Sequence, residues 1–424
     1  MKRQSIKRQT LVTTACSLLN RGLGFLLRLL VNKALGPEAV GVMELAGSAH
    51  MLALTPVAAG LPGAVSRMTA QAEEKDRSLI LCAGRRLAVL LALAVTPLML
   101  LLSPLIARLM GDTRVLPSLL LFSPCVLLVG VSGVYDGYCY GRGCAWPPAI
   151  SELSEQAARM AVTLGLVFLL PSLTVAGKAA VPALAGTVGE GIGLAVVMAL
   201  AGRTPTAKKD VRVPDVCREL TRLSLPLTAG RLTHTALRAV SGVMIPKRLM
   251  AAGLTAPEAM SRMGMLNGMV MPLLFLPGML AGALGTVGGP AAARCRGRRA
   301  ENRLTLRLLL PAFLAGLCCC LGLRVLAPRL AMGLYRLPDM APLLRAMSPL
   351  AVIMPVQQVL SGCMAGLGLQ RKTLRASLLG AAATLLFTWI WAADPALHIY
   401  GAGFASLLGH GLTLLCSGIS FILR

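Results

Sequence analysis

Residues 20–62 read NRGLGFLLRLLVNKALGPEAVGVMELAGSAHMLALTPVAAGLP, two apolar runs joined by a short turn around Gly36 and Pro37. Each run is about as long as the roughly 20 residues that a helix needs to cross a bilayer. The first run carries two arginines, Arg21 and Arg28, and the second ends among prolines and glycines. We therefore predict two membrane-spanning helices, the first with cations inside the apolar layer.

The composition extends this prediction to the whole chain. Of its 424 residues, 56% are apolar and 14% are charged, and the mean hydropathy is +0.72. Soluble domains carry about a quarter charged residues. A single membrane anchor would leave most of this apolarity unexplained, so we predict an integral membrane protein with many spans.

The basic excess does not indicate a nucleic-acid partner. The net charge is +25, but the lysines and arginines lie between apolar runs, as is typical of loops beside a membrane. Most of the twelve cysteines lie inside apolar runs and form no paired motif with histidines, so we expect no metal site. The basic N-terminal segment is followed by no clear cleavage site, so we expect no removable signal peptide.

Apolar runs between polar segments predict an all-α polytopic membrane protein with about twelve spans in two six-helix lobes. The longest polar stretch, 202–222, is the predicted cytoplasmic linker between an N-terminal lobe, 1–201, and a C-terminal lobe, 223–424. The predicted spans lie near 11–31, 42–62, 87–107, 115–135, 150–171, 179–201, 223–245, 263–288, 305–326, 342–366, 376–392 and 400–422.

A weak internal repeat supports the two lobes. Arg21 and Arg28 in the first span match Arg231 and Arg238 in the seventh, and the shared spacing puts each pair on one helix face. The second span of each lobe also contains helix-interrupting residues, which we predict to act as hinges: Pro56, Gly60 and Pro62, and then Pro277 and Gly282. Repeated lobes with matching helix breaks are typical of alternating-access transporters.

The four arginines form the strongest candidate binding site. A cation at the bilayer centre costs about 3 kcal/mol or more, so an intramembrane arginine is expected to face a cavity or a partner. Guanidinium groups fit phosphate oxygens as a planar fork, which predicts a phosphate-bearing substrate. Gln357 and Gln358 are candidate further contacts. The alternatives are arginines that reach lipid head groups and glutamines that bond neighbouring helices.

Intramembrane acids are candidates for binding a coupling ion. Glu44 and Glu190 are the clearest of these, and His234 shares the seventh span with two arginines. The alternatives are that the acids pair with arginines and that the histidine is a hydrogen-bonded interior residue. Three further charged residues open the fifth span, Glu152 as a predicted helix cap and Glu155 with Arg159 as a predicted i,i+4 pair.

Motifs of soluble catalysis do not occur in the sequence. It contains no GxxxxGK[ST] phosphate loop, no HExxH zinc motif and no GxSxG nucleophile elbow, and no polar segment is long enough for a nucleotide-binding domain. We therefore expect no enzyme and no organic cofactor. An ion gradient, the membrane potential or a partner would supply energy, and the coupling ion is left open.

Several motifs carry a resemblance to a known family. They are Arg-x-Leu-Gly-Phe-x-x-Arg at 21–28, a Leu-Gly turn at 35–36 and Ala-Gly-Leu-Pro at 59–62, together with GYCYGRGCAWPPAISELSEQAARM, IPKRL and SGCMAGLGLQRKTLRAS. With them the chain resembles polysaccharide-biosynthesis and stage V sporulation protein B-like transporters. These belong to the multidrug/oligosaccharidyl-lipid/polysaccharide (MOP) superfamily, which also contains MurJ-type lipid II flippases and MATE exporters.

The resemblance implies a MATE-like fold and a flippase of the bacterial cytoplasmic membrane. Its expected substrate is an undecaprenyl-linked glycan, a lipid II-like cell-wall, spore-cortex or polysaccharide precursor, and its expected partners are membrane lipids and cell-wall synthesis proteins. Sporulation-type members often carry two further C-terminal spans and an acidic residue where this chain has Ser241. Two alternatives stay open: a MATE-like cation-coupled multidrug exporter, and a non-transporting membrane scaffold of a cell-wall synthesis complex.

The distribution of basic residues predicts the topology. Alternate connections, counted with both termini, carry 26 lysines and arginines on one side and 8 on the other, and the basic side stays cytoplasmic. We expect both termini and the 202–222 linker to be cytoplasmic. Cysteine-accessibility labelling can check this, and labelling of positions 208 and 209 from the outside of intact cells would reverse the orientation.

Overall fold

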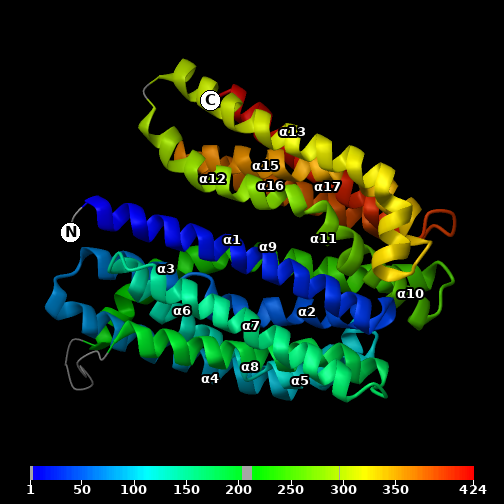
Figure 1. Cartoon of the computed structure of the whole chain (residues 1–424), viewed down its shortest axis with the longest axis horizontal. Helices are drawn as coiled ribbons and strands as arrows, with labels where there is room; N and C mark the ends of the chain where they lie inside the picture. Colours follow the sequence, from blue (N-terminus) through cyan, green and yellow to red (C-terminus); the bar gives the residue numbers. More distant parts are fainter. Residues whose placement is uncertain (1–2, 203–212, 296) are drawn as a thin grey trace. The chain divides into compact units, whose positions relative to one another are not determined.

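The computed structural model describes residues 3–202, 213–295 and 297–424, and within these ranges the regular elements are helices (Figure 1). Six of them are long and apolar enough to cross a membrane, and two bent helix pairs raise that number to eight. The all-α membrane fold is therefore confirmed. Each of the twelve predicted spans overlaps a helix or a bent pair of helices, but twelve spans as a count are not confirmed.

The chain divides into two compact units. Unit 1 comprises Met1–Leu35 and Val42–Ala239, and unit 2 comprises Gly36–Gly41 and Val240–Arg424. The chain passes from unit 1 to unit 2 for the last time after Ala239, within α9. The helices up to and including this one are α1 (Arg3–Leu35), α2 (Pro37–Ala58), α3 (Leu61–Gln71), α4 (Glu74–Met110), α5 (Leu116–Phe122), α6 (Cys125–Gly141), α7 (Trp146–Leu169), α8 (Val175–Ala201) and α9 (Val213–Ala251), with a short 3₁₀ turn η1 (Thr113–Val115) before α5.

These units differ from the predicted lobes, 1–201 and 223–424, because α9 begins earlier and stays with unit 1 as far as Ala239. Asp215 lies in its first turn, where a carboxylate favours the helix N-terminus. Val213 and Leu220 are buried in a core shared with α3, α4 and α6. The described part of the predicted linker is thus the start of a helix, whereas 203–212, with Lys208 and Lys209, lies outside the described residues.

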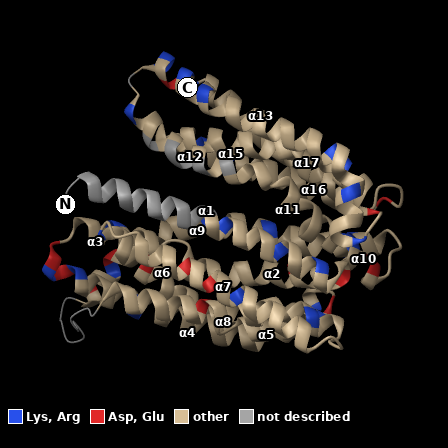
Figure 2. Cartoon of the chain, viewed as in Figure 1, with Lys and Arg blue, Asp and Glu red and all other residues tan. Residues whose placement is uncertain are grey.

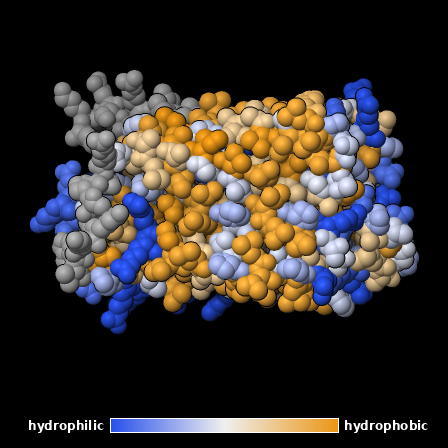
Figure 3. Space-filling view, turned by 90° about the horizontal axis from the view of Figure 1, so that it is seen from below, coloured by the Kyte–Doolittle hydropathy of each residue, from blue (hydrophilic) through white to orange (hydrophobic). Residues whose placement is uncertain are grey.

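Unit 1 packs small residues where α7 meets α8 and exposes large apolar residues on α4. α7 packs along α8, and Ser151 of α7 donates a hydrogen bond to the Gly193 carbonyl oxygen over 2.7 Å. α4 presents exposed leucines along its length, among them Leu93, Leu101 and Leu109. On the face drawn in Figure 3, hydrophobic residues fill the middle and hydrophilic residues gather toward both ends, the pattern expected for contact with lipid.

Unit 2 is built from the second half of the chain, in which α12 packs against α15, α15 against α13, and α16 along α17. Its helices after α9 are α10 (Ala256–Met263), α11 (Met271–Leu274), α12 (Leu276–Arg294), α13 (Arg298–Leu330), α14 (Met340–Met347), α15 (Leu350–Gly366), α16 (Gln370–Trp391) and α17 (Ile399–Ile422), with π-helical turns η2 (Gly264–Val270) and η3 (Ala331–Tyr335).

Helix breaks lie beside four of the five predicted hinge positions, all except Gly282. Pro56 lies in the last turn of α2, the helix stops before Gly60, and Pro62 lies in the first turn of α3. In unit 2, Pro277 opens α12 directly after the break that follows α11, and Gly282 is buried within α12. Proline is tolerated in a first helical turn because its missing N–H is not needed there. Their action as hinges stays a prediction.

The first turn of α2 is fixed to unit 2 by two glycines. A Cβ added to Gly41 would overlap the carbonyl oxygen of Met260, and one added to Gly264 would overlap the carbonyl oxygen of Pro37. The backbones of α2 and of the α10–η2 segment therefore touch directly. Only glycine leaves room for this approach, which explains why residues 36–41 group with the second half of the chain.

Replacing Gly41 with alanine should destabilise the protein. The methyl group would meet backbone that cannot move aside, and overpacking of this kind costs about 1–3 kcal/mol. The matched control is Gly47→Ala in the same helix, where an added Cβ meets nothing within 4 Å. The thermal unfolding midpoint of the protein in detergent measures both. Equal midpoints for the two variants would contradict the close contact.

Candidate functional site

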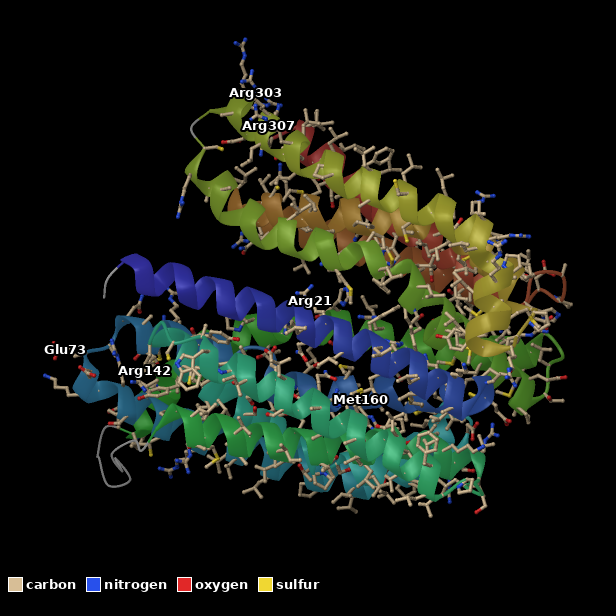
Figure 4. The ribbon with its side chains drawn as sticks, in the orientation of Figure 1. Arg21, Glu73, Arg142, Met160, Arg303 and Arg307 are labelled. Atoms are coloured by element: carbon tan, nitrogen blue, oxygen red, sulfur yellow. The ribbon has the colours of Figure 1, made fainter. Side chains whose placement is uncertain are left out.

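The four predicted substrate-binding arginines lie in unit 1. Arg21 and Arg28 are on α1. Arg231 and Arg238 are on the part of α9 that belongs to unit 1, which ends at Ala239. All four are exposed, and Arg21 lies near the middle of α1 (Figure 4). Both pairs belong to one compact unit in this division of the chain, and the expectation that each pair opens its own lobe stays a prediction.

Glu44 connects the two arginine-bearing helices. Its Oε1 accepts a hydrogen bond from Nη2 of Arg28 over 2.6 Å, which makes an ion pair between α1 and α2. The Arg238 guanidinium of α9 is the second cation within electrostatic range of the same carboxylate. The structure therefore confirms the pairing alternative for Glu44 and brings three predicted site residues, from three helices, into one cluster.

α2 and α9 run beside each other in opposite directions. Thr55 donates to the hydroxyl oxygen of Thr235 over 3.2 Å, and a Cβ added to Gly60 would overlap the Ser224 carbonyl oxygen. Gly60 is thus required by the packing of α9, whatever its role as a hinge. His234 is exposed on α9 beside this contact, and Arg238 is within electrostatic range of its ring.

A second polar cluster joins α1 to α7. Asn20 donates its side-chain N–H to Oε2 of Glu152 over 3.2 Å, and Arg21 is within electrostatic range of the same carboxylate. The prediction that Glu152 caps the start of its helix is wrong, because α7 begins at Trp146 and places Glu152 beyond the first turn. Glu152 instead links two helices that are far apart in the sequence.

The same unit holds an acidic group around Arg159. Arg159 pairs with Glu155 one turn before it, as predicted, and its Nη2 lies 3.9 Å from Oε1 of Glu190 on α8. The structure therefore confirms the pairing alternative for Glu190. Asp136 on α6 lies within electrostatic range of Glu155 and Glu152. Charged residues thus occur along the middle of the unit 1 helices as well as at their ends (Figure 2).

Sequence reasoning missed Asp136. The predicted span stopped at residue 135, which assigned this aspartate to a loop, but α6 continues to Gly141. The apolar and aromatic residues that follow it, Tyr138, Cys139 and Tyr140, were the available signal that the helix went on. A boundary error of about two turns was enough to hide an acidic residue inside the unit.

The predicted glutamines lie in unit 2. Oε1 of Gln357 on α15 is 3.0 Å from Nδ1 of His410 on α17, which matches the helix-packing alternative for this glutamine. Gln358 is exposed, with its side chain near Gly278 of α12 and its backbone near Gly285, and its role stays a prediction. Among the described residues, no group of three histidine, cysteine, aspartate or glutamate side chains has the geometry to hold a metal ion.

The Arg159 cluster allows a test of charge balance. Arg159→Gln should lower the thermal midpoint because it leaves two carboxylates without their cation, at a cost between the ~1 kcal/mol of exposed pairs and the ~3–5 kcal/mol of buried ones. Adding Glu155→Gln should restore part of the midpoint, since it removes one uncompensated charge. A double variant less stable than the single one would contradict this account.

The comparisons with known proteins agree with this architecture. Stage V sporulation protein B of Bacillus subtilis (strain 168) is 27% identical, over 98% of this chain and 83% of that protein. An inward-facing MATE family transporter of the MOP superfamily superposes with a TM-score of 0.77 at 16% identity, over 95% of this chain and 94% of the other. The lipid II flippase MurJ, inward closed, superposes with a TM-score of 0.76 at 13% identity, over 97% and 87%.

These likenesses confirm the predicted resemblance and the MOP fold. The two solved structures share the fold at low sequence identity, and they include a multidrug transporter as well as a flippase, so the fold alone does not select a substrate. A family model described as polysaccharide biosynthesis protein matches residues 6–296, more than half of the sequence. The chain therefore belongs to the polysaccharide biosynthesis protein family.

Proposed function

We propose that this protein moves a polyprenyl-linked glycan across the bacterial cytoplasmic membrane by alternating access. In this proposal, Arg21, Arg28, Arg231 and Arg238 bind the diphosphate that joins glycan to lipid. The family match, the sporulation relative and the MurJ-like fold support a transporter of lipid-linked glycans. The identity of the glycan and the direction of movement are part of the proposal.

The observation that carries the proposal is the polarity of α9. This helix has 39 residues, enough to cross a membrane, and yet it is not among the described helices that are apolar enough to be candidate membrane spans. Its exposed residues include Arg231, His234 and Arg238. A long helix with exposed cations is suited to a water-filled path that carries an anion. α1 supplies the other two arginines from the same unit.

The chemistry of the arginines fits a diphosphate. A guanidinium group keeps its charge at any physiological pH and offers two parallel N–H donors to two phosphate oxygens. Two arginines on each helix provide more positive charge than Glu44 and Glu152 neutralise. The excess would attract a head group with about two negative charges. Outside this site, the polyprenyl chain would stay in the lipid that the exposed leucines of α4 also contact.

The energy source belongs to the proposal as well. Glu190 lies 3.9 Å from Arg159, and His234 lies within electrostatic range of Arg238, so each titratable group has a permanent cation nearby. We propose that either residue could couple transport to a proton gradient. The two compact units supply the two bodies that alternating access needs.

A second candidate function is export of organic cations, as in the MATE alternative. The acidic group in unit 1, formed by Asp136, Glu152, Glu155 and Glu190, favours this function because carboxylates attract cationic compounds. Proteoliposomes separate the two candidates. Leaflet exchange of a labelled lipid-linked oligosaccharide supports the first, and concentrative efflux of a fluorescent organic cation without such exchange supports the second.

Arg21→Ala and Arg28→Ala should abolish exchange of the labelled lipid-linked oligosaccharide between leaflets. Lysine keeps the positive charge but lacks the two parallel N–H donors of the guanidinium group. We therefore expect partial activity for Arg28→Lys and near-complete loss of activity for Arg21→Lys. We place the stricter requirement at Arg21 because it lies nearer the middle of its helix than Arg28 does. Leaflet accessibility of the label in proteoliposomes measures the rates.

The matched controls are Arg303→Ala and Arg307→Ala, two exposed arginines near the start of α13 in unit 2 (Figure 4). They should exchange the substrate at the parental rate. All variants must first insert and accumulate like the parent, because removing a charge can also alter folding. Exchange at the parental rate in both Arg21→Ala and Arg28→Ala would contradict the proposed role of these arginines in binding substrate.

A further inference from the structure

The cluster around Glu44 has a charge balance that a simple ion pair lacks. The Glu44 carboxylate pairs with the Arg28 guanidinium and lies within electrostatic range of a second one, that of Arg238. The Glu44 side chain is 24% exposed and that of Arg28 is 43% exposed, so neither is sealed from a ligand. The three residues come from α2, α1 and α9, which are all parts of unit 1 at these positions.

A carboxylate and a phosphate compete for the same face of a guanidinium group. Both present two oxygens at the spacing of the N–H fork, and each forms charge-assisted hydrogen bonds with it. A diphosphate carries about two negative charges, which would match both arginines, whereas the carboxylate matches one. The 2.6 Å bond from Nη2 of Arg28 to Glu44 therefore occupies one of the N–H donors that a diphosphate would use.

We infer that Glu44 is an internal counter-ion, which holds Arg28 and Arg238 in place without substrate and which the diphosphate of a lipid-linked substrate displaces. This inference rests on the proposed function, since it assumes that the two arginines bind the diphosphate. It assigns Glu44 a role that differs from ion coupling. The carboxylate lowers the affinity for substrate and, by returning to Arg28, promotes release.

Glu44→Gln tests the inference because glutamine keeps the size of the side chain and removes its charge. The probe is radiolabelled geranylgeranyl diphosphate, bound at equilibrium to the full-length protein in detergent, with inorganic diphosphate in parallel to separate head-group binding from tail binding. We expect Glu44→Gln to bind both probes about two- to tenfold more tightly, the range expected for loss of a partly exposed competing charge. Its maximal exchange rate in proteoliposomes should fall, because release becomes slower.

The control is Glu73→Gln, which makes the same charge change in an exposed pair with Lys75 (Figure 4). It should leave probe affinity and exchange rate unchanged. If Glu44→Gln does not fold, Glu44→Asp replaces it, and the shorter carboxylate should raise probe affinity by a smaller factor. Unchanged or weaker probe binding in a folded Glu44 variant would overturn the inference.

A further variant separates failure of this inference from failure of the proposed function. Arg28→Ala should bind both probes more weakly than the parent protein does. If it does so while Glu44→Gln gains no affinity, the arginine site stands and the counter-ion role is wrong. If Arg28→Ala binds the probes as the parent does, the proposed diphosphate site itself is wrong, and with it the counter-ion role.

Discussion

Holding guanidinium groups within membrane-length helices is the constraint on which the rest of unit 1 depends. An arginine inside the apolar layer must meet water or an acid, because transfer of an unpaired cation into lipid costs several kcal/mol. Unit 1 meets this constraint with acids on neighbouring helices, Glu44 for Arg28, Glu152 near Arg21 and Glu190 near Arg159, and with Glu155 on the same helix as Arg159. The packing of α1, α2, α7 and α8 is therefore tied to charge as well as to apolar contact.

Unit 2 follows a different rule in the part of the chain that the structure describes. Its ion pairs lie near helix ends, such as Arg262 with Asp339 and Arg424 with Glu301. Inside the unit, polar contacts are made between groups such as Gln357 and His410. Both units are helical, but unit 1 holds ion pairs along its helices, whereas the ion pairs of unit 2 lie near helix ends. This difference is the reason to place the proposed recognition of an anion in unit 1.

The sequence was sufficient to predict the all-helical membrane fold and the family, because hydropathy and short motifs are local properties. It also predicted the pair of Glu155 and Arg159, since an i,i+4 pair is local on a helix. It could not predict that Asn20 bonds Glu152 or that Glu190 reaches Arg159, because these contacts depend on how helices pack. The membership of α9 in unit 1 was missed because polar residues at its start resemble a linker.

A structure of the full-length protein with a lipid-linked glycan bound tests the central claim most directly. The account predicts that oxygens of the diphosphate lie within hydrogen-bond distance of the Arg21 and Arg28 guanidinium groups, and that Glu44 has moved away from Arg28. A bound glycan whose diphosphate lies away from all four arginines, with the ion pair between Arg28 and Glu44 intact, would contradict it.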